Sequence, residues 1–177
     1  MEEDKQTATE ETESSEETTD KEEANADEAD SDEEEAAEAE ADEAEAELEA
    51  AIEVENDLRS EIVTYALQFV GNRYKYGGTN PNTGVDCSGF TSYVMRHAAE
   101  VELPHSSGGQ SRMGRQVSSS EMRPGDIICY GSGKRINHVA LYIGNGQIVH
   151  ASTERTGIKV SRWNYRTPVR IVNVLGD

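Results

Sequence analysis

The charge of this chain is divided unequally along its length, and that division limits which part can fold. Residues 1–57 carry 28 acidic and 2 basic side chains, whereas residues 58–177 carry 8 acidic and 14 basic ones. The first segment is almost only Glu, Asp, Ala, Ser and Thr, so it cannot bury enough apolar surface to offset the entropy lost on ordering. We therefore predict one folded domain in residues 58–177, preceded by a disordered acidic arm in residues 1–57.

The acidic arm has some capacity to form a helix. Residues 33–52 mix Ala and Glu, which have good helix propensity, but they form no apolar stripe until Leu48, Ile52 and Val54. We expect the arm to be disordered or transiently helical and to act as a solubilising tether. The alternative is an arm of net charge −26 that contacts the folded domain of net charge +6.

The composition of the folded domain excludes several classes of partner. Its Lys and Arg residues are scattered, without a basic stripe or a nucleic-acid-binding motif, so we expect no nucleic acid partner. No run is apolar and long enough to span a membrane. The Gly77-Gly78 pair lacks the strand–loop–helix surroundings of a phosphate-binding loop. We expect a monomer without a cofactor or a metal.

Hydrophobic periodicity places helices before strands. A helix is predicted from Asp57 or Ser60 to Phe69, a second from Cys87 or Ser88, and a short third over 107–115. The period then changes to two, which predicts five strands over residues 127–130, 139–143, 147–151, 158–163 and 169–174. This order is typical of an α+β domain in which N-terminal helices pack on an antiparallel sheet.

The run Asp86-Cys87-Ser88-Gly89-Phe90 places a thiol where an apolar helix begins. Unpaired backbone N–H groups and the positive end of the helix dipole favour the thiolate there. His138 and His150 follow about fifty residues later, on either side of an Asn-Gly turn. One cysteine with later histidines is the set of groups that a thiol hydrolase requires.

The turn between the two histidines decides whether they can act together. A two-residue Asn145-Gly146 loop would put His138 and His150 on opposite faces of the hairpin. A three-residue loop that includes Gly144 shifts the register by one residue and gathers the apolar side chains of both strands on one face. The hydrophobic pattern favours the longer loop, which puts both histidines on one surface, within reach of a common thiol.

The cysteines and histidines also allow other interpretations. Cys129 lies in an apolar run and is expected to be a buried strand residue, although a disulfide with Cys87 is an alternative. A zinc site formed by Cys87, His138 and His150 would need a fourth ligand, and no short ligand spacing supports it. His97 falls on the apolar face of the second helix and is expected to be a core histidine.

Several motifs together resemble the NlpC-type cell-wall peptidase domain, the NlpC/P60 family. The resemblance covers nearly all of residues 58–177 and rests on the order and spacing of these motifs. They are Tyr74-x-Tyr76-Gly77-Gly78, Asp86-Cys87-Ser88-Gly89-Phe90, Leu103-Pro104-His105-Ser106-Ser107 followed by Gln110, Arg123-Pro124-Gly125-Asp126, the run from His138 to Gly146, and His150-Ala151-Ser152.

The resemblance implies a papain-like α+β fold with a catalytic triad. By position, Cys87 is the nucleophile, His138 is the base and His150 orients it. The N–H of Cys87 or Ser88 and the Tyr74 hydroxyl would hold the oxyanion, and the residues expected to contact substrate are Asp86, Ser88, His105 and Ser107. The chain departs from the family where Tyr76 replaces a frequent Trp and His105 replaces a frequent Arg.

The resemblance also implies a substrate and a location. We expect a cysteine endopeptidase that cleaves peptidoglycan stem peptides between γ-linked D-glutamate and the diamino acid. The alternatives are an amidase or acyltransferase of the same superfamily, and a catalytically idle wall-binding module. No signal peptide is visible, because charged residues follow Met1 at once. We expect an extracellular or wall-associated protein whose signal peptide has been removed.

Overall fold

The computed structural model of the chain describes residues 29–177, with side chains from residue 40 onwards. The expected disorder of residues 1–28 lies outside the described residues. The chain divides into two compact units, Met1–Ala44 and Glu45–Asp177. The second unit contains all the residues on which the sequence analysis bases a function.

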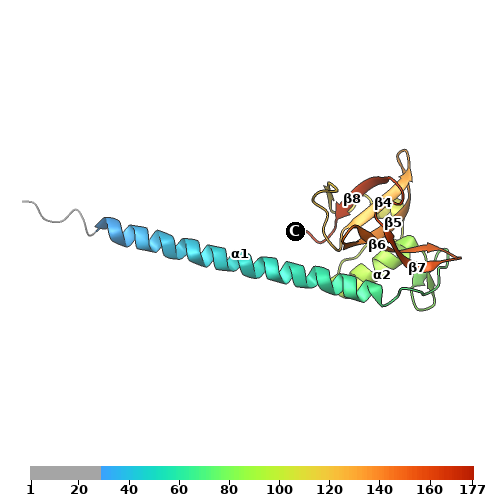
Figure 1. Cartoon of the computed structure of the whole chain (residues 1–177), viewed down its shortest axis with the longest axis horizontal. Coiled ribbons are helices and arrows are strands. Elements are labelled where there is room, and N and C mark those ends of the chain that lie inside the picture. The colour runs from blue at the N-terminus through green and yellow to red at the C-terminus, as the bar shows by residue number, and fades with distance from the viewer. Residues whose placement is uncertain (1–28) are drawn as a thin grey trace, which may run out of the picture. The chain divides into compact units, whose positions relative to one another are not determined.

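Three helices and eight strands are present in the described residues (Figure 1). The helices are α1 (Ala29–Leu67), α2 (Cys87–Ala99) and α3 (Ser107–Gln110), and the strands are β1 (Thr79–Asn80), β2 (Gly84–Val85), β3 (Arg115–Val117), β4 (Ile127–Ser132), β5 (Arg135–Gly144), β6 (Gln147–Thr153), β7 (Gly157–Arg162) and β8 (Pro168–Asn173). Strands β3 to β8 form one antiparallel sheet in the order β3-β8-β4-β5-β6-β7. The predicted α+β fold, with helices packed on an antiparallel sheet, is confirmed.

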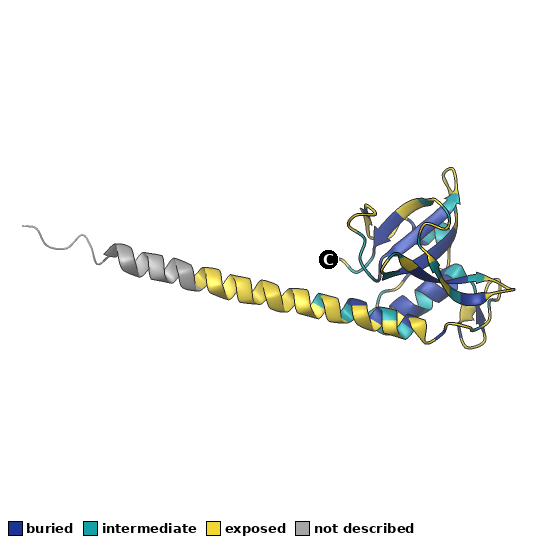
Figure 2. Ribbon diagram, viewed as in Figure 1, coloured by how far each residue is buried: buried dark blue, intermediate teal, exposed yellow. Residues whose placement is uncertain are grey.

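Helix α1 begins earlier than the sequence predicted. It starts at Ala29 rather than Asp57 or Ser60, and it runs through the expected domain boundary at residue 57 without a break. The Ala- and Glu-rich composition explains the extension, since these residues form helix without needing to be buried. Side chains from Glu45 to Val54 are exposed, and burial begins at Leu58 and Arg59 (Figure 2). The predicted start therefore coincides with the point at which the helix begins to pack.

The main core lies between the helices and one face of the sheet. It contains Ile62 and Ala66 of α1, Phe90 and Val94 of α2, and strand residues such as Leu141. A second buried cluster lies on the other face of the same strands, and includes Ile128, Tyr130, Ala140, Tyr142 and Ile148. The period of two along β4, β5 and β6 thus separates two apolar layers, because successive side chains point to opposite faces.

The hairpin of β5 and β6 has the register that the hydrophobic pattern predicted. Leu141 pairs with Val149 rather than with His150, and Tyr142 pairs with Ile148. The turn residues Gly144, Asn145 and Gly146 have φ values of 90°, 53° and 72°. Two glycines are well suited to this turn, because such positive values are costly for most side chains. This register is what brings the two histidines to one face.

Two local expectations were wrong. Helix α3 ends at Gln110 rather than near Arg115, because a turn follows in which Gly114 has a φ of 64° and lies against the backbone of Asn173. His97 is exposed rather than part of the core. Its ring stacks on Tyr93 at a centroid distance of 4.0 Å, and its Nδ1 lies 2.7 Å from the Tyr93 carbonyl oxygen. The His97 ring therefore packs against Tyr93 on the helix surface, which explains its place in the apolar pattern without burial in the core.

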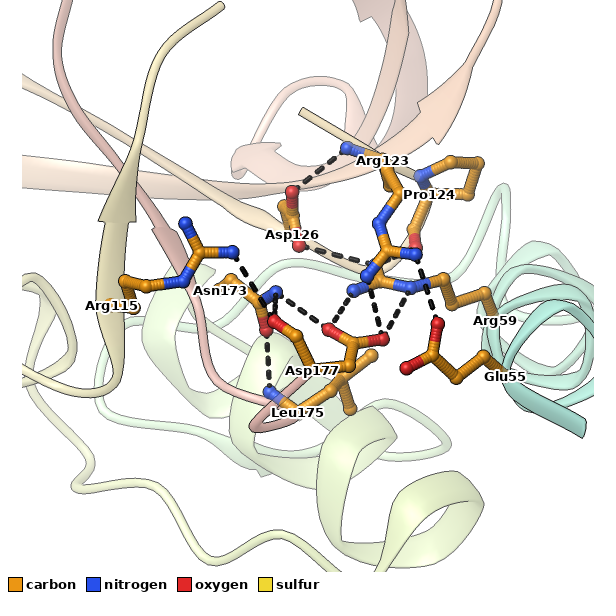
Figure 3. Close-up of polar contacts among 9 residues, drawn as sticks. All are labelled: Glu55, Arg59, Arg115, Arg123, Pro124, Asp126, Asn173, Leu175 and Asp177. Atoms are coloured by element: carbon orange, nitrogen blue, oxygen red, sulfur yellow. Dashed lines mark hydrogen bonds and ion pairs between the residues drawn. The ribbon is translucent and has the colours of Figure 1, made fainter. Parts of the chain in front are cut away.

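A buried ion-pair network joins α1 to the sheet (Figure 3). Arg59 is only 3% exposed, and it donates from Nη1 to the Pro124 carbonyl at 2.6 Å and to Asp126 Oδ1 at 3.2 Å. Its Nη2 donates to Asp177 Oδ1 at 2.6 Å. Burial raises the pKa of Asp126, but the N–H of Arg123 and the Arg59 guanidinium act against it. Asp126 therefore depends on Arg59 for its charged form.

We predict that replacing Arg59 by Met lowers the free energy of unfolding by about 3–5 kcal/mol, because the substitution leaves the buried Asp126 carboxylate without its ion-pair partner. Urea denaturation monitored by circular dichroism measures this. The control is Arg155→Met, which changes an exposed turn residue and is expected to cost no more than about 0.5 kcal/mol. Equal stabilities of the two variants would contradict the dependence on Arg59.

Candidate active site

The start of α2 is fixed by Asp86 and Gly89. Asp86 has extended backbone angles and accepts a hydrogen bond at Oδ1 from the N–H of Gly89 at 2.8 Å, so it is the N-cap of the helix. Its Oδ2 accepts the N–H of Gly77 at 3.1 Å. A Cβ at Gly89 would lie 2.2 Å from the carbonyl oxygen of Gly78, so no larger residue fits there. These contacts place Cys87 at the first position of the helix.

The Cys87 thiol is half-buried at this helix end. Burial raises its pKa, and the N–H groups of Val139 and Ser88 lower it, as does the N–H of Cys87 itself. The expected effect of the helix N-terminus is therefore present, but burial outweighs it and favours the neutral thiol. Val139 directly follows His138 in β5, so the thiol faces the strand that carries the histidine. A direct contact between the thiol and the His138 ring stays a prediction.

The two histidines form a buried pair on one face of the sheet. His138 Nε2 lies 2.7 Å from His150 Nδ1, and His150 Nε2 lies 2.9 Å from the hydroxyl oxygen of Ser161 on β7. His150 is fully buried, and His138 is nearly so. Three neighbouring strands therefore contribute one side chain each to a hydrogen-bonded row.

Both imidazoles are held neutral. Burial lowers the pKa of His138 to about 4, with a further contribution from the positive charge of Arg166. Burial lowers the pKa of His150 to about 3, with contributions from His138 and Lys159. A neutral imidazole can accept a proton, which is the state that a general base requires.

The other predicted site residues divide into two groups. Tyr74, Asp86 and Ser88 lie close to Cys87. Burial raises the Tyr74 pKa, and the nearby Cys87 adds to this effect. His105 belongs with them, because its Nε2 lies 2.8 Å from Asp86 Oδ1.

Ser107 belongs to a different set of contacts. Its hydroxyl donates to the carbonyl of Ile136 at 3.4 Å and so joins α3 to β5. The structure therefore gives Ser107 a contact within the protein, and its contact with substrate stays a prediction.

Three residues that complete this region were not predicted from the sequence, and a fourth, Gln110, was identified only as part of a motif, without a role. Gln110 is fully buried, and its Nε2 donates to the carbonyl of Ser88 at 2.8 Å, which anchors α3 to α2. Tyr165 lies with its ring centroid 5.4 Å from that of His150. Ser161 and Arg166 are the other two. The alternation of side chains along β7 could have placed Ser161 on the same face of the sheet as the histidines, but only if the pairing of β6 with β7 were known.

The two cysteines are not joined in a disulfide. Cys129 is fully buried in β4, as predicted, and burial raises its pKa to about 12. Within residues 40–177, no three His, Cys, Asp or Glu side chains meet in a metal-binding arrangement. None of the helices in the described part of the chain has a stretch apolar and long enough to cross a membrane.

A thiol at the start of a helix, facing the strand of an antiparallel sheet that carries a histidine, is the arrangement of papain-like α+β domains. The family model of the NlpC/P60 family matches residues 71–171, more than half of the chain. The chain therefore belongs to the NlpC/P60 family, and the resemblance drawn from its motifs is confirmed.

Curated relatives share this region. Murein DD-endopeptidase MepS/murein LD-carboxypeptidase of Escherichia coli K12 is 41% identical over 108 residues, which cover 61% of this chain and 56% of that protein. A probable endopeptidase p60 of Listeria seeligeri is 42% identical over 98 residues, which cover 55% of this chain and 18% of that protein. The chain thus matches about half, or less, of the length of these relatives.

Solved structures agree in fold. The NlpC/p60 domain of the peptidoglycan hydrolase SagA superposes with a TM-score of 0.60 at 32% identity, covering 65% of this chain and 97% of that one. The peptidoglycan hydrolase RipB of Mycobacterium tuberculosis superposes with a TM-score of 0.61 at 28% identity, covering 69% of this chain and 67% of that one. Both similarities support the papain-like assignment of the folded unit.

The buried neutral histidines predict a pH-dependent stability. Between about pH 6.5 and pH 4 the unfolded chain binds protons on His138 and His150 that the folded protein does not bind. The free energy of unfolding is therefore expected to fall as the pH is lowered through this range. Urea denaturation at several pH values measures it.

The exposed His97 supplies the control for this measurement. His97→Gln is expected to keep the same slope of stability against pH, whereas His150→Asn is expected to reduce it. A slope that is unchanged in His150→Asn would show that the buried pair is not its source.

Proposed function

We propose that this protein is a cysteine endopeptidase that hydrolyses peptidoglycan stem peptides through Cys87, His138 and His150. The observation that carries the proposal is the buried 2.7 Å hydrogen bond between the two imidazoles, beside a thiol at a helix N-terminus. The names of the relatives support the substrate, since they include murein and peptidoglycan hydrolases.

The hydrogen-bonded row suggests how the base is prepared. When His138 carries its proton on Nε2, it donates to His150 Nδ1, and His150 Nε2–H donates to Ser161. This pattern leaves Nδ1 of His138 without a proton and able to accept one from the Cys87 thiol. His150 therefore selects the tautomer of the base, as the third member of a triad does.

The reaction then follows the scheme of thiol acyl transfer. His138 removes the proton from Cys87, and the sulfur attacks the amide carbon to form a tetrahedral intermediate. The N–H groups of Cys87 and Ser88 that face the sulfur, together with the Tyr74 hydroxyl, would stabilise the oxyanion. His138 returns the proton to the leaving amine, and water hydrolyses the acyl-enzyme.

The bond we propose is that between γ-linked D-glutamate and the diamino acid. The Escherichia coli relative is named a DD-endopeptidase and LD-carboxypeptidase, so cleavage at a D-alanyl cross-link is the second candidate. Mass analysis of the new termini after digestion of purified muropeptides distinguishes the two. Both substrates are wall components, which supports an extracellular or wall-associated location.

The proposed mechanism makes Cys87 the nucleophile, so its removal is expected to abolish activity. Cys87→Ala is expected to lower muropeptide hydrolysis by at least about a thousandfold, because no other group replaces the thiolate. Cys129→Ala changes the second, buried thiol and is the matched control, with hydrolysis retained. Full activity in Cys87→Ala would disprove the thiol mechanism. The wall-binding alternative predicts no hydrolysis in the wild-type protein either.

The proposed role of His138 as the base also predicts how activity depends on pH. Activity requires neutral His138, so kcat/KM is expected to fall with acidification only near pH 4, the lowered pKa of this group. An unperturbed histidine would place this limb near pH 6.5. Initial rates between pH 3.5 and pH 8, with protein shown to be folded at each pH, provide the test. An acid limb between pH 6 and pH 7 would show that His138 is not kept neutral by its surroundings.

A further inference from the structure

The turn between β7 and β8 brings an arginine to the edge of the histidine pair. Arg166 donates from Nη2 to Asn137 Oδ1 at 3.0 Å, and Asn137 directly precedes His138. Its guanidinium carbon lies 5.7 Å from the centroid of the Tyr130 ring. Tyr130 pairs with His138 across β4 and β5, and their ring centroids are 5.9 Å apart. Two contacts with residues beside His138 thus position Arg166.

The charge of Arg166 is not neutralised by the protein. Within residues 40–177, its partners are the amide of Asn137, the ring of Tyr130 and the side chain of Tyr165, and no Asp or Glu forms an ion pair with it. A guanidinium has five N–H donors in a fork that matches the two oxygens of a carboxylate, so donors remain for a ligand. By contrast, Arg59 and Arg123 are each held by carboxylates.

The chemistry of the reaction indicates which half of the substrate Arg166 meets. His138 must reach the leaving nitrogen to return the proton, so the amine half of the substrate lies on the His138 side of Cys87. Arg166 hydrogen bonds to the residue that precedes His138, and its positive charge contributes to the lowered pKa of the His138 ring. Stem peptides carry carboxylates, and a carboxylate on the leaving amino acid would be directed towards the guanidinium.

We infer that Arg166 is a specificity-determining residue that binds a carboxylate of the leaving diamino acid. This inference rests on the proposed function and adds to it a requirement on the substrate. A stem peptide that ends in a free carboxylate at the diamino acid is a better substrate than the same peptide with that carboxyl group amidated.

The experiment compares two synthetic tripeptides, L-alanyl-γ-D-glutamyl-L-lysine with a free C-terminal carboxylate and its C-terminal carboxamide, because lysine has only this one carboxyl group. The wild-type protein is expected to cleave the carboxylate with a kcat/KM at least about tenfold higher, the value of a charge-assisted hydrogen bond. Arg166→Gln is expected to abolish this preference and Arg166→Lys to keep part of it. Circular dichroism of each variant serves as the control for folding.

The matched control is Arg162→Gln, which removes an exposed arginine at the end of β7. It is expected to keep the full preference for the carboxylate. If Arg166→Gln keeps the preference, or if the wild-type protein cleaves both tripeptides equally, the inference is wrong while the proposed function stands. If the wild-type protein cleaves neither, the proposed bond is wrong and the inference is wrong with it.

Discussion

The register of the β5–β6 hairpin is the constraint on which the site depends. Side chains alternate between the two faces of a strand, so a shift of one residue would move His150 into the helix-facing core and leave His138 alone. Gly144 and Gly146 permit the three-residue turn, and the apolar face formed with Val149 makes it the favoured one. The same pairing that buries the core therefore forms the 2.7 Å contact between the imidazoles.

Local patterns predicted the parts of this protein that depend on neighbours in sequence. The start of α2 followed from the apolar periodicity that begins near Cys87, and the hairpin register followed from alternation on either side of one turn. His97 shows the limit of periodicity. The helical periodicity correctly placed His97 on the same face as apolar residues. Its ring stacks on Tyr93 at the surface of the helix, however, and is not buried in the core.

The residues that escaped prediction are those whose partners lie on elements brought together only by folding. Ser161 reaches His150 across the β6–β7 pairing, and Arg59 meets Asp177 from a position 118 residues away. Arg166 has the same character, since its proximity to His138 arises from Asn137 and Tyr130 on two other strands. No spacing in the sequence encodes such contacts, because loop length does not fix which side chains meet.

The histidine pair differs from a triad that ends in a carboxylate. Within residues 40–177 neither His138 nor His150 hydrogen bonds to Asp or Glu, so no negative charge of the protein bonds to the imidazolium that forms when His138 takes a proton. Arg166 makes that imidazolium less favourable still. A substrate carboxylate bound to Arg166 would cancel this effect and make His138 a stronger base. Substrate binding and activation of the thiol would then be coupled through one guanidinium, so that the base reaches full strength only when the leaving group is in place.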